Sequence, residues 1–419
     1  MALRHEIAST LGYPSWADYY AADKMATNGA SVAGFIQRLG DAARDPARRE
    51  FAMLLEEKRK THPGAGEIWD YEGNYYKELV RRAQYSFDSQ STRPYLPYAQ
   101  VKQGILDTAA TFFHLSFKQE PGAPAWDPSV ETWAAFDDGK RIGRFYLDMS
   151  PRPGKFSHAE MVPVLDGIRG RQLPEAALVC NFPAPTPTDP GLMSLSDVES
   201  FFHEFGHLMH WILAGKQPWA GIGGLTMEAD FVEAPSMMLE ELVRSPQVLG
   251  SFARHWQTQA AIPADLIAAA NRASAFGRAS YVALQTSFSA ISYDLYKGDP
   301  DTLDLDAVTD RNMRAHVLYT PTPGTHFWAA FGHLGGYSSA YYTYMWDLEI
   351  AQDFWSQFEP GDPLKGDAPM RYRRQVLEPG GSMSANDLVK GFLGRPQNMT
   401  ALLRWMGKEF EEGARAQAR

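Results

Sequence analysis

Three of the chain's 11 histidines fall within ten positions, in the stretch FFHEFGHLMH at residues 201–210. His203, Glu204 and His207 form a His-Glu-x-x-His pattern, in which two imidazoles lie one helical turn apart and can bind one ion together. The carboxylate between them suits a general base that accepts a proton from water. From the composition, such a pattern is expected only about 0.03 times in a chain of this length. The spacing therefore predicts a hydrolytic metal site, and zinc is the favoured metal.

A polar stripe exposed to solvent is the alternative explanation for these residues. On an ideal helix Glu199, His203, His207 and His210 project from the side opposite the apolar residues. The apolar residues of this segment are Val198, Phe201, Phe202, Phe205, Leu208, Met209, Ile212 and Leu213. A solvated stripe usually carries Lys, Glu and Arg, whereas this one carries three histidines. The metal site is therefore the preferred interpretation.

The helix that carries the histidines has a start signal and a stop signal in the sequence. Ser196 and Glu199 match a capping box, in which each side chain bonds the backbone N–H of the other residue. Gly215 and the later Pro218 predict that the helix ends at about Ala214.

A catalytic zinc ion needs a third protein ligand and one open position. A histidine six residues after His207 is excluded, because that position is Leu213. The following segment, MEADFVEAPSMMLEELVRSP (227–246), is expected to form a helix that Pro246 ends, and it offers several acids. These are Glu228, Asp230, Glu233, Glu240 and Glu241. Spacing does not choose among them, although the apolar neighbours of Glu233 favour it slightly.

Two further polar residues on the histidine helix have more than one explanation. Glu199 and His210 can orient the metal ligands from behind, as residues around zinc sites commonly do. Glu199 is also explained by the capping box, and His210 by an ordinary polar helix position. A structural zinc site would instead be closed by a fourth protein ligand, for which His210 is a candidate.

Composition limits the class of protein around this site. The chain has 419 residues, a mass of 46.8 kDa, 44% hydrophobic residues and a net charge of −10, so it can bury a large core. The acidic balance argues weakly against a nucleic-acid or anionic-membrane partner. Cys180 is the only cysteine, the start MALRHEIAST lacks the apolar core of a secretion signal, and no run approaches about 20 apolar residues. We expect a cytoplasmic protein without a membrane span.

Most of the remaining sequence has helical periodicity, as at residues 31–62 and 99–117. Between 130 and 182 the pattern favours strands, with a hairpin across Asp137-Asp138-Gly139 and a buried strand at EAALVCNF. The strand GRFYLDM is either an edge that pairs with an extended peptide or part of a core hairpin. The sequence thus predicts a mainly α fold with a small β-sheet just before the histidine helix. Residues 1–129 would form a helical N-terminal portion and 130–419 the catalytic portion.

The segment FGHLGGYSSAYYTYMW (331–346) combines paired glycines with a histidine and several tyrosines. Glycines allow backbone movement, and tyrosine hydroxyls can donate hydrogen bonds to a developing oxyanion. Tyr341, Met345 and Leu348 also have helical spacing, which is typical of aromatic residues packed in a core. Residue types alone favour packing.

Several of these motifs together resemble the thimet oligopeptidase family, which includes neurolysin, oligopeptidase A and dipeptidyl carboxypeptidase. The resemblance rests on FFHEFGHLMH and DFVEAPS, and it continues through GRFYLDMSPRPGK, FGHLGGYSSAYYTYMW and LEPGGSMSANDLVKGFLGR. Met237 stands where the family commonly has Gln, and the loop before the tyrosines is one residue shorter than in many relatives. The start, LRHEIASTLGYPSWADYYAADKMA, resembles the middle of longer members, so the resemblance implies that their N-terminal helical portion is absent here.

The resemblance implies a zincin-type, neurolysin-like helical fold and a specific site. It implies that His203, His207 and Glu233 bind one Zn²⁺ and that Glu204 is the general base. It also implies that His333, Tyr337 and Tyr341 line the substrate cleft. Tyr344, helped by Tyr337 or His333, would stabilise the oxyanion.

The implied activity is a zinc-dependent oligopeptidase that hydrolyses internal bonds of short peptides. One alternative is a peptidyl-dipeptidase that releases dipeptides from the C-terminus. Another is a non-catalytic, zinc-stabilised remnant that binds peptides, although such a protein would have no need of Glu204 as a base. The expected partners are short peptides, with no nucleic acid and no membrane.

Overall fold

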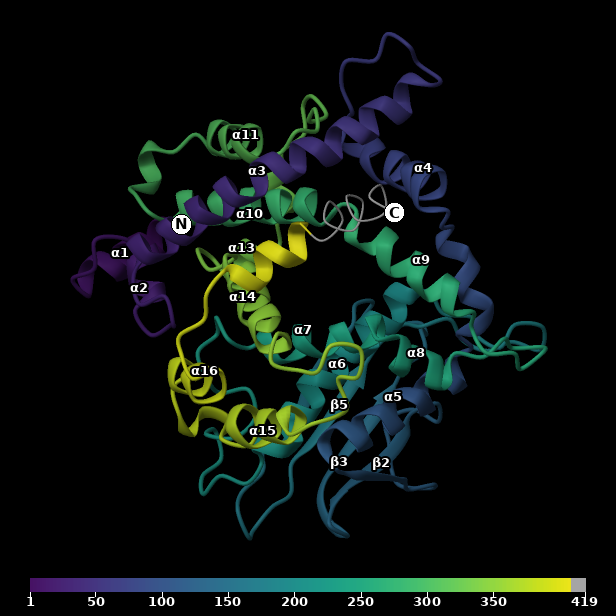
Figure 1. Cartoon of the computed structure of the whole chain (residues 1–419). Coiled ribbons are helices and arrows are strands. Elements are labelled where there is room, and N and C mark those ends of the chain that lie inside the picture. Colours follow the sequence, from purple (N-terminus) through teal and green to yellow (C-terminus); the bar gives the residue numbers. More distant parts are fainter. Residues whose placement is uncertain (408–419) are drawn as a thin grey trace. The chain divides into compact units, whose positions relative to one another are not determined.

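The computed structural model describes residues 1–407 (Figure 1). The chain divides into two compact units. Unit 1 consists of Met1–Asp88, Ala269–Asp347 and the segment that starts at Met399, and unit 2 consists of Ser89–Ala268 and Leu348–Asn398. Each unit is built from separated stretches of sequence. The functional boundary near residue 130 does not coincide with this division and stays a prediction.

Unit 1 is helical throughout the part that the structure describes. Its elements are α1 (Ala2–Thr10), α2 (Trp16–Ala21), α3 (Gly29–Arg59), η1 (Asp70–Glu72), α4 (Gly73–Tyr85), α10 (Arg278–Asp294), η4 (Pro300–Thr302), α11 (Leu305–His316), α12 (Phe327–Ala330) and α13 (His333–Gly336), with most of α9 (Ala264–Ala275) and the start of α14 (Thr343–Trp355). Helix α3 confirms the helix predicted at 31–62.

The long helix α3 packs along α10 and also stabilises its N-terminus. Helix α10 begins after Gly277, which has a φ of 95° and no side chain with which to cap the helix. The buried carboxylate of Glu50, on α3, accepts hydrogen bonds from the backbone N–H groups of Gly277, Ala279 and Ser280, at 3.1, 3.1 and 2.7 Å. A distant part of the sequence thus supplies the anion that a helix N-terminus favours.

Unit 2 contains the β-sheet and the histidine helix. Its elements are η2 (Ser89–Tyr95), α5 (Tyr98–Phe113), β1 (Ser116–Gln119), β2 (Glu131–Asp137), β3 (Lys140–Asp148), β4 (Glu160–Leu165), β5 (Glu175–Val179), α6 (Leu195–Ala214), α7 (Ala234–Glu240), η3 (Glu241–Arg244), α8 (Pro246–Phe252), α15 (Ala368–Tyr372), the π-helical turn η5 (Arg373–Leu377), η6 (Gly380–Ser382) and α16 (Ala385–Leu393). The helix predicted at 99–117 ends earlier, because His114 turns into the left-handed region and β1 follows.

The five strands form one mixed sheet in the order β1-β2-β3-β5-β4. Strands β3 and β5 are parallel, and every other neighbouring pair is antiparallel. The predicted hairpin is confirmed: β2 and β3 meet at a turn where Asp138 and Gly139 have φ values of 48° and 76°. Strand β3, the GRFYLDM segment, pairs on both sides and is therefore a central strand. The free edge beside the histidine helix belongs to β4 instead.

Helix α6 lies against β3, β4 and β5, and Figure 1 shows it beside β5. The rings of Phe145 on β3 and Phe205 on α6 are both fully buried, with their centroids 6.1 Å apart. Gly143 lets the helix come close, because a Cβ there would lie 2.7 Å from the Cδ1 atom of Ile212. The mainly α fold with a small sheet beside the histidine helix is thus confirmed.

Within residues 1–407, no helix combines the length and the apolar composition that a membrane crossing requires.

Candidate metal centre

Helix α6 begins two residues earlier than its sequence predicts. The cap is Ser194, whose hydroxyl accepts from the N–H of Asp197 at 3.1 Å, while the Asp197 carboxylate accepts from the N–H of Ser194 at 2.7 Å. The capping box predicted for Ser196 and Glu199 is therefore wrong in register. The predicted end at Ala214 is confirmed.

The side of α6 that carries the histidines is buried, which contradicts the expectation that it projects away from the core. The predicted apolar residues of the helix are buried, but the exposed fraction is also only 7% for Glu204, 7% for His207 and 0% for His210. A solvated polar stripe is thus excluded, and these polar groups need partners inside the protein.

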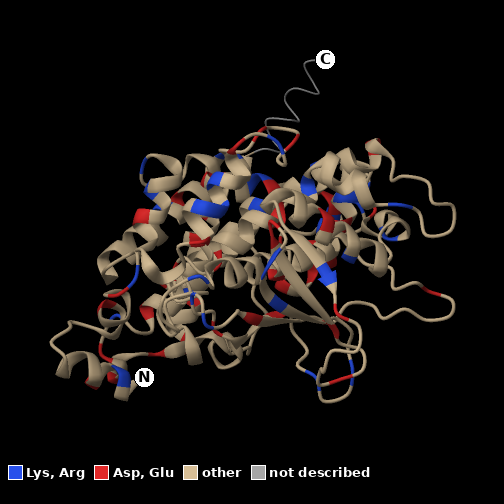
Figure 2. Ribbon diagram, turned by 90° about the horizontal axis from the view of Figure 1, so that it is seen from below, with Lys and Arg blue, Asp and Glu red and all other residues tan. Residues whose placement is uncertain are grey.

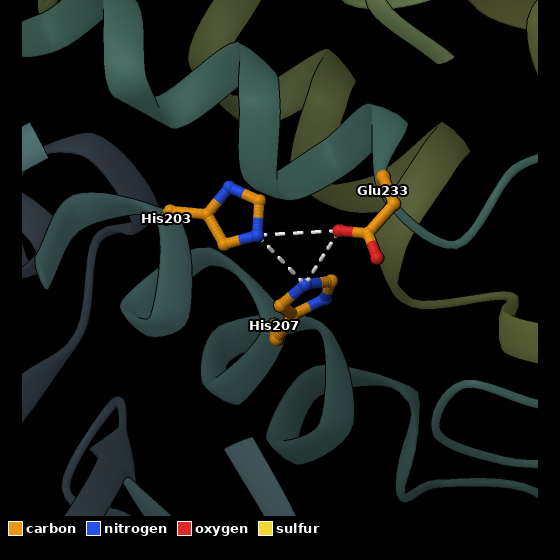
Figure 3. Close-up of side chains that lie close together, drawn as sticks. All are labelled: His203, His207 and Glu233. Atoms are coloured by element: carbon orange, nitrogen blue, oxygen red, sulfur yellow. Dashed lines mark hydrogen bonds and ion pairs between the residues drawn. The ribbon is translucent and has the colours of Figure 1, made fainter. Parts of the chain in front are cut away.

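His203, His207 and Glu233 converge on one point (Figure 3). The two imidazoles project from α6, one turn apart, and the carboxylate reaches them from the residue that precedes α7. Nε2 of His203 lies 3.2 Å from Nε2 of His207, and Oε2 of Glu233 lies 3.2 and 3.1 Å from the same two nitrogens. Among the residues that the structure describes, these three are the group able to hold a metal ion.

The geometry of this group fits a zinc ion. Four ligands at about 2.0–2.1 Å in a tetrahedron are separated from one another by roughly 3.3 Å, close to the observed separations of 3.1–3.2 Å. Two imidazoles and a carboxylate are also a usual donor set for zinc with one open position. His203, His207 and Glu233 are therefore the residues that would hold the ion.

Gly206, between the two histidines, allows the third ligand to approach. A Cβ at this position would lie 2.7 Å from Cα of Ser236, near the start of α7, and real side chains do not tolerate such a distance to backbone. The missing side chain therefore lets α7 lie directly on α6, with Glu233 at its N-terminal boundary. Gly206 is visible in the sequence, but only the packing of α7 on α6 shows why a glycine is needed there.

Glu240 contacts His203 on the side of the ring opposite the metal group. Nδ1 of His203 lies 2.6 Å from Oε1 of Glu240, which leaves Nε2 directed at the shared point. Burial would lower the pKa of His203, but the carboxylates of Glu233 and Glu240 raise it well above its ordinary value. The two histidines, in turn, hold the pKa of Glu233 far below its usual range despite burial. Glu240 was one of five candidate ligands in the sequence, and the structure gives it this orienting contact instead.

We expect Glu240→Ala to weaken zinc binding by about 10- to 100-fold, because an orienting hydrogen bond fixes both the tautomer and the direction of the ligating ring. Competition with a chromophoric chelator would measure the dissociation constant. Glu240→Gln keeps an acceptor oxygen and should lie between the wild type and the alanine variant. If all three proteins bind zinc equally, the contact with His203 has no orienting role.

The other candidate acids of this segment have different partners. Residues 229–233 form turns, and the helix starts only at Ala234, so the single helix predicted over 227–246 is wrong in its first part. Glu228 accepts from the backbone N–H of Ala385 at 3.0 Å. Glu241 accepts from Nε2 of Gln352 at 2.8 Å. Of the five acids, Glu233 belongs to the group that can hold a metal.

Glu204, the predicted general base, lies between the two histidines on α6. Burial raises the pKa of its carboxyl, and the nearby His203 and His207 oppose this rise. The backbone of Met161, on the edge strand β4, also lies near enough to lower the pKa of this carboxyl. The base is therefore held between the metal group and the free edge of the sheet.

His210 and Glu199 differ in the partners that the structure gives them. Neither ring nitrogen of His210 has a hydrogen-bond partner within the described residues, and Glu199 forms an ion pair with Arg244. The proposed orienting role of both residues, and the fourth-ligand role of His210, therefore receive no support from these contacts.

We expect His210→Leu to raise the free energy of unfolding at pH 7 by about 1–3 kcal/mol, because two buried polar atoms would no longer be unsatisfied. Burial lowers the pKa of His210 to about 3, against about 6.5 in an unfolded chain. The unfolded state thus binds more protons between these values, and the wild type loses stability as the pH falls below about 6.5.

The Leu variant lacks this loss, so its advantage should widen as the pH falls. Urea denaturation at pH 7.5 and 5.5, with chelator present so that metal release does not contribute, would measure both effects. A variant less stable than the wild type at both pH values would contradict the expectation.

The aromatic residues predicted to line a cleft form one cluster in unit 1. The ring of His333 lies 5.1 Å from that of Tyr341 and 5.8 Å from those of Tyr337 and Tyr344. Tyr341 is buried against Phe331, which favours packing for this residue, and burial raises its pKa to about 12. The cluster and the metal group belong to different units, so the role of these residues beside the metal stays a prediction.

Comparison with proteins of known sequence points to one family. The chain matches peptidase family M3 over residues 1–408. It is 29% identical to the thimet-like oligopeptidase of Dictyostelium discoideum and to oligopeptidase A of Escherichia coli (strain K12), over 97% of this chain and 63% and 61% of those proteins. It is 30% identical to saccharolysin of Saccharomyces cerevisiae, over 97% of this chain and 60% of that protein. The chain thus spans about three fifths of the length of these curated relatives.

Solved structures show the same fold. PZ peptidase A, solved with an inhibitor, gives a TM-score of 0.59 at 13% identity, covering 98% of this chain and 63% of that one. The M32 carboxypeptidase of Deinococcus radiodurans R1 gives a TM-score of 0.56 at 14% identity, covering 98% and 72%. The family match extends over nearly all of the sequence and includes the helix and the segment that bring His203, His207 and Glu233 together. This chain therefore belongs to peptidase family M3.

Proposed function

We propose that the protein is a zinc-dependent oligopeptidase that hydrolyses internal bonds of short peptides. The observation that carries this proposal is the convergence of His203, His207 and Glu233, with the buried Glu204 carboxylate beside them on the same helix. A bound zinc ion would lower the pKa of its water to about 7 and polarise a peptide carbonyl.

Glu204 performs the proton transfers in this mechanism. Its carboxylate accepts a proton from the attacking water and delivers it to the amine that leaves. Burial supports this role, because it raises the pKa of the carboxyl toward the neutral range, in which a general base is effective. Deep burial also removes bulk water that would compete for the proton.

The free edge of β4 is a candidate docking site for the peptide backbone. Among residues 1–407, β4 pairs with β5 and with no other strand, so its other edge is open to strand addition, and extended peptides commonly add to such edges. The backbone of Met161 on this strand lies near enough to Glu204 to lower the pKa of its carboxyl, so the strand lies next to the base. Val164 and Leu165 at the end of the strand are exposed, and can contact alternate side chains of an extended peptide.

Tyr344, together with Tyr337 or His333, is proposed to stabilise the oxyanion. All three side chains are at least partly exposed, and their rings lie within one cluster. Tyr341 is buried against Phe331. It is therefore proposed to stabilise the packing of this cluster and to contact substrate less than the other three residues do.

Two alternative functions can be separated from this one. Dipeptidyl carboxypeptidase of Escherichia coli is also 29% identical to this chain, so release of C-terminal dipeptides is a second candidate activity. A non-catalytic zinc-stabilised protein is disfavoured because the group found among the described residues has three members, which leaves a position for water. The cytoplasm is proposed as the compartment, since Cys180 is the single cysteine.

Hydrolysis of internally quenched fluorescent peptides tests the proposal. We expect activity that a chelator abolishes and that added zinc restores. Peptides with a free and with an amidated C-terminus should be cleaved equally by an oligopeptidase, whereas a peptidyl-dipeptidase needs the free end. Activity that persists after the metal has been removed and its absence verified would overturn the zinc mechanism.

A further inference from the structure

A pocket of about 720 Å³ lies in unit 2 and shares no lining residue with the metal group. It is formed by the turn between β2 and β3, the loop between β4 and β5, and the residues that follow α6. Its volume falls within the range of small-molecule sites, about 300–1,000 Å³. Nothing in the proposed peptidase mechanism uses it.

The lining of this pocket is basic, although the chain as a whole has a net charge of −10. Figure 2 shows Lys and Arg interspersed with Asp and Glu along most of the ribbon. The pocket differs from this pattern, because five of its lining residues are basic and two are acidic. The basic residues are Lys140, Arg141, Arg169, Arg171 and Lys216.

Two of these cations are available to a ligand. Within the described residues, Lys140 and Arg171 have no ion pair and no side-chain hydrogen bond, and both side chains are exposed. They come from different elements, the start of β3 and the loop before β5, and both line the pocket. Arg169 donates from Nε to the backbone carbonyl of Lys216 at 2.8 Å.

The two acidic residues of the lining do not neutralise its excess of positive charge. Asp137 already pairs with the buried guanidinium of Arg373 and with Nζ of Lys216 at 3.6 Å. Asp138 lies exposed at the tip of the hairpin. Arg141 forms an ion pair at 2.8 Å with Glu120, which does not line the pocket.

Part of the pocket lining is apolar. Ile142, Ile168 and Leu173 contribute to it, and the exposed fraction of Leu173 is 42%, which is high for a leucine. A small inorganic anion would leave these apolar side chains in contact with water. A ligand with an apolar or aromatic body and an anionic group would cover it and meet the cations as well.

We propose that this pocket binds a nucleotide, with its phosphates at Lys140 and Arg171 and its base against Ile142, Ile168 and Leu173. The planar guanidinium of Arg171 suits bidentate contacts to phosphate oxygens, and the ammonium of Lys140 supplies a point charge. The proposed binding site does not depend on the proposed peptidase activity, so the failure of one proposal would not affect the other.

Isothermal titration calorimetry with ATP, inorganic triphosphate and adenosine tests the proposal. We expect saturable binding of ATP that weakens as salt rises, with adenosine and triphosphate each binding at least about 10-fold more weakly. Lys140→Ala/Arg171→Ala should weaken ATP binding by at least about 10-fold. Lys60→Ala/Arg311→Ala removes the same charge from exposed positions of unit 1 and should bind ATP as the wild type does.

All three proteins keep the metal group, so chelation of the metal by ATP contributes equally to each and cannot produce this difference. Equal ATP affinity in the two double variants would overturn the proposal, as would the absence of saturable binding. Triphosphate binding as tight as ATP, or an acidic peptide binding more tightly than ATP, would overturn the assignment of a nucleotide.

Discussion

Glu204→Gln should reduce kcat by at least about 10²- to 10⁴-fold while zinc stays bound, because the amide cannot accept the proton of the attacking water. The carboxylate lies between the metal group and the backbone N–H of Met161, and glutamine nearly preserves its size. Initial rates on a quenched fluorescent peptide would measure the change, and elemental analysis would measure the metal content.

The control for this variant is Glu6→Gln, the same chemical change at an exposed position of α1. We expect it to keep the wild-type rate. A Glu204→Gln protein that retains both zinc and full activity would remove the general base from the proposed mechanism. Loss of zinc together with activity would show instead that Glu204 contributes to binding the ion.

Glu233→Gln should weaken zinc binding by more than the roughly 10- to 100-fold expected from removing an orienting residue, because it replaces a direct anionic ligand with a neutral amide. Oε2 of Glu233 lies 3.2 and 3.1 Å from the Nε2 atoms of His203 and His207. Activity should fall with the metal content, and a chelator competition assay would give the dissociation constant.

Glu228→Gln is a matched control, since it makes the same substitution five residues away. Its carboxylate contacts the backbone N–H of Ala385 and does not belong to the metal group. Zinc affinity should be unchanged in this variant. An equal loss in both variants would mean that the segment as a whole, and not the Glu233 carboxylate, determines metal binding.

The local parts of this site were predictable from sequence. The spacing of His203, Glu204 and His207 places three side chains along one helix, because helical geometry relates residues four apart without reference to the rest of the fold. The end of α6 and the hairpin between β2 and β3 follow in the same way from glycine and turn chemistry, and the structure confirms both. The resemblance to a family added Glu233, which residue spacing alone did not choose.

The burial of α6 was not predictable in this way. Its polar residues suggested an exposed side, yet His207 and Glu204 are buried. The reason is that the helix packs against the sheet on one side and α7 on another, so from Phe201 onward most of its side chains are buried, whereas Ser196 and Ser200 near its start are exposed. The predicted N-cap of α6 was Ser196, whereas the structure has Ser194. Sequence did not distinguish the two serines, because each is followed three residues later by an acid.

Sequence by itself determined which residues could form a metal site and where the helix that carries two of them would end, because these are short-range properties of the chain. Tertiary structure decided the partners that lie far apart in sequence. Glu240 reaches His203 only because Gly206 lets α7 pack directly on α6. The edge strand β4, and not the central β3, lies beside Glu204 because of the order of strands in the sheet. Such contacts depend on how separate elements pack against one another, and this packing cannot be predicted from the spacing of residues along the chain.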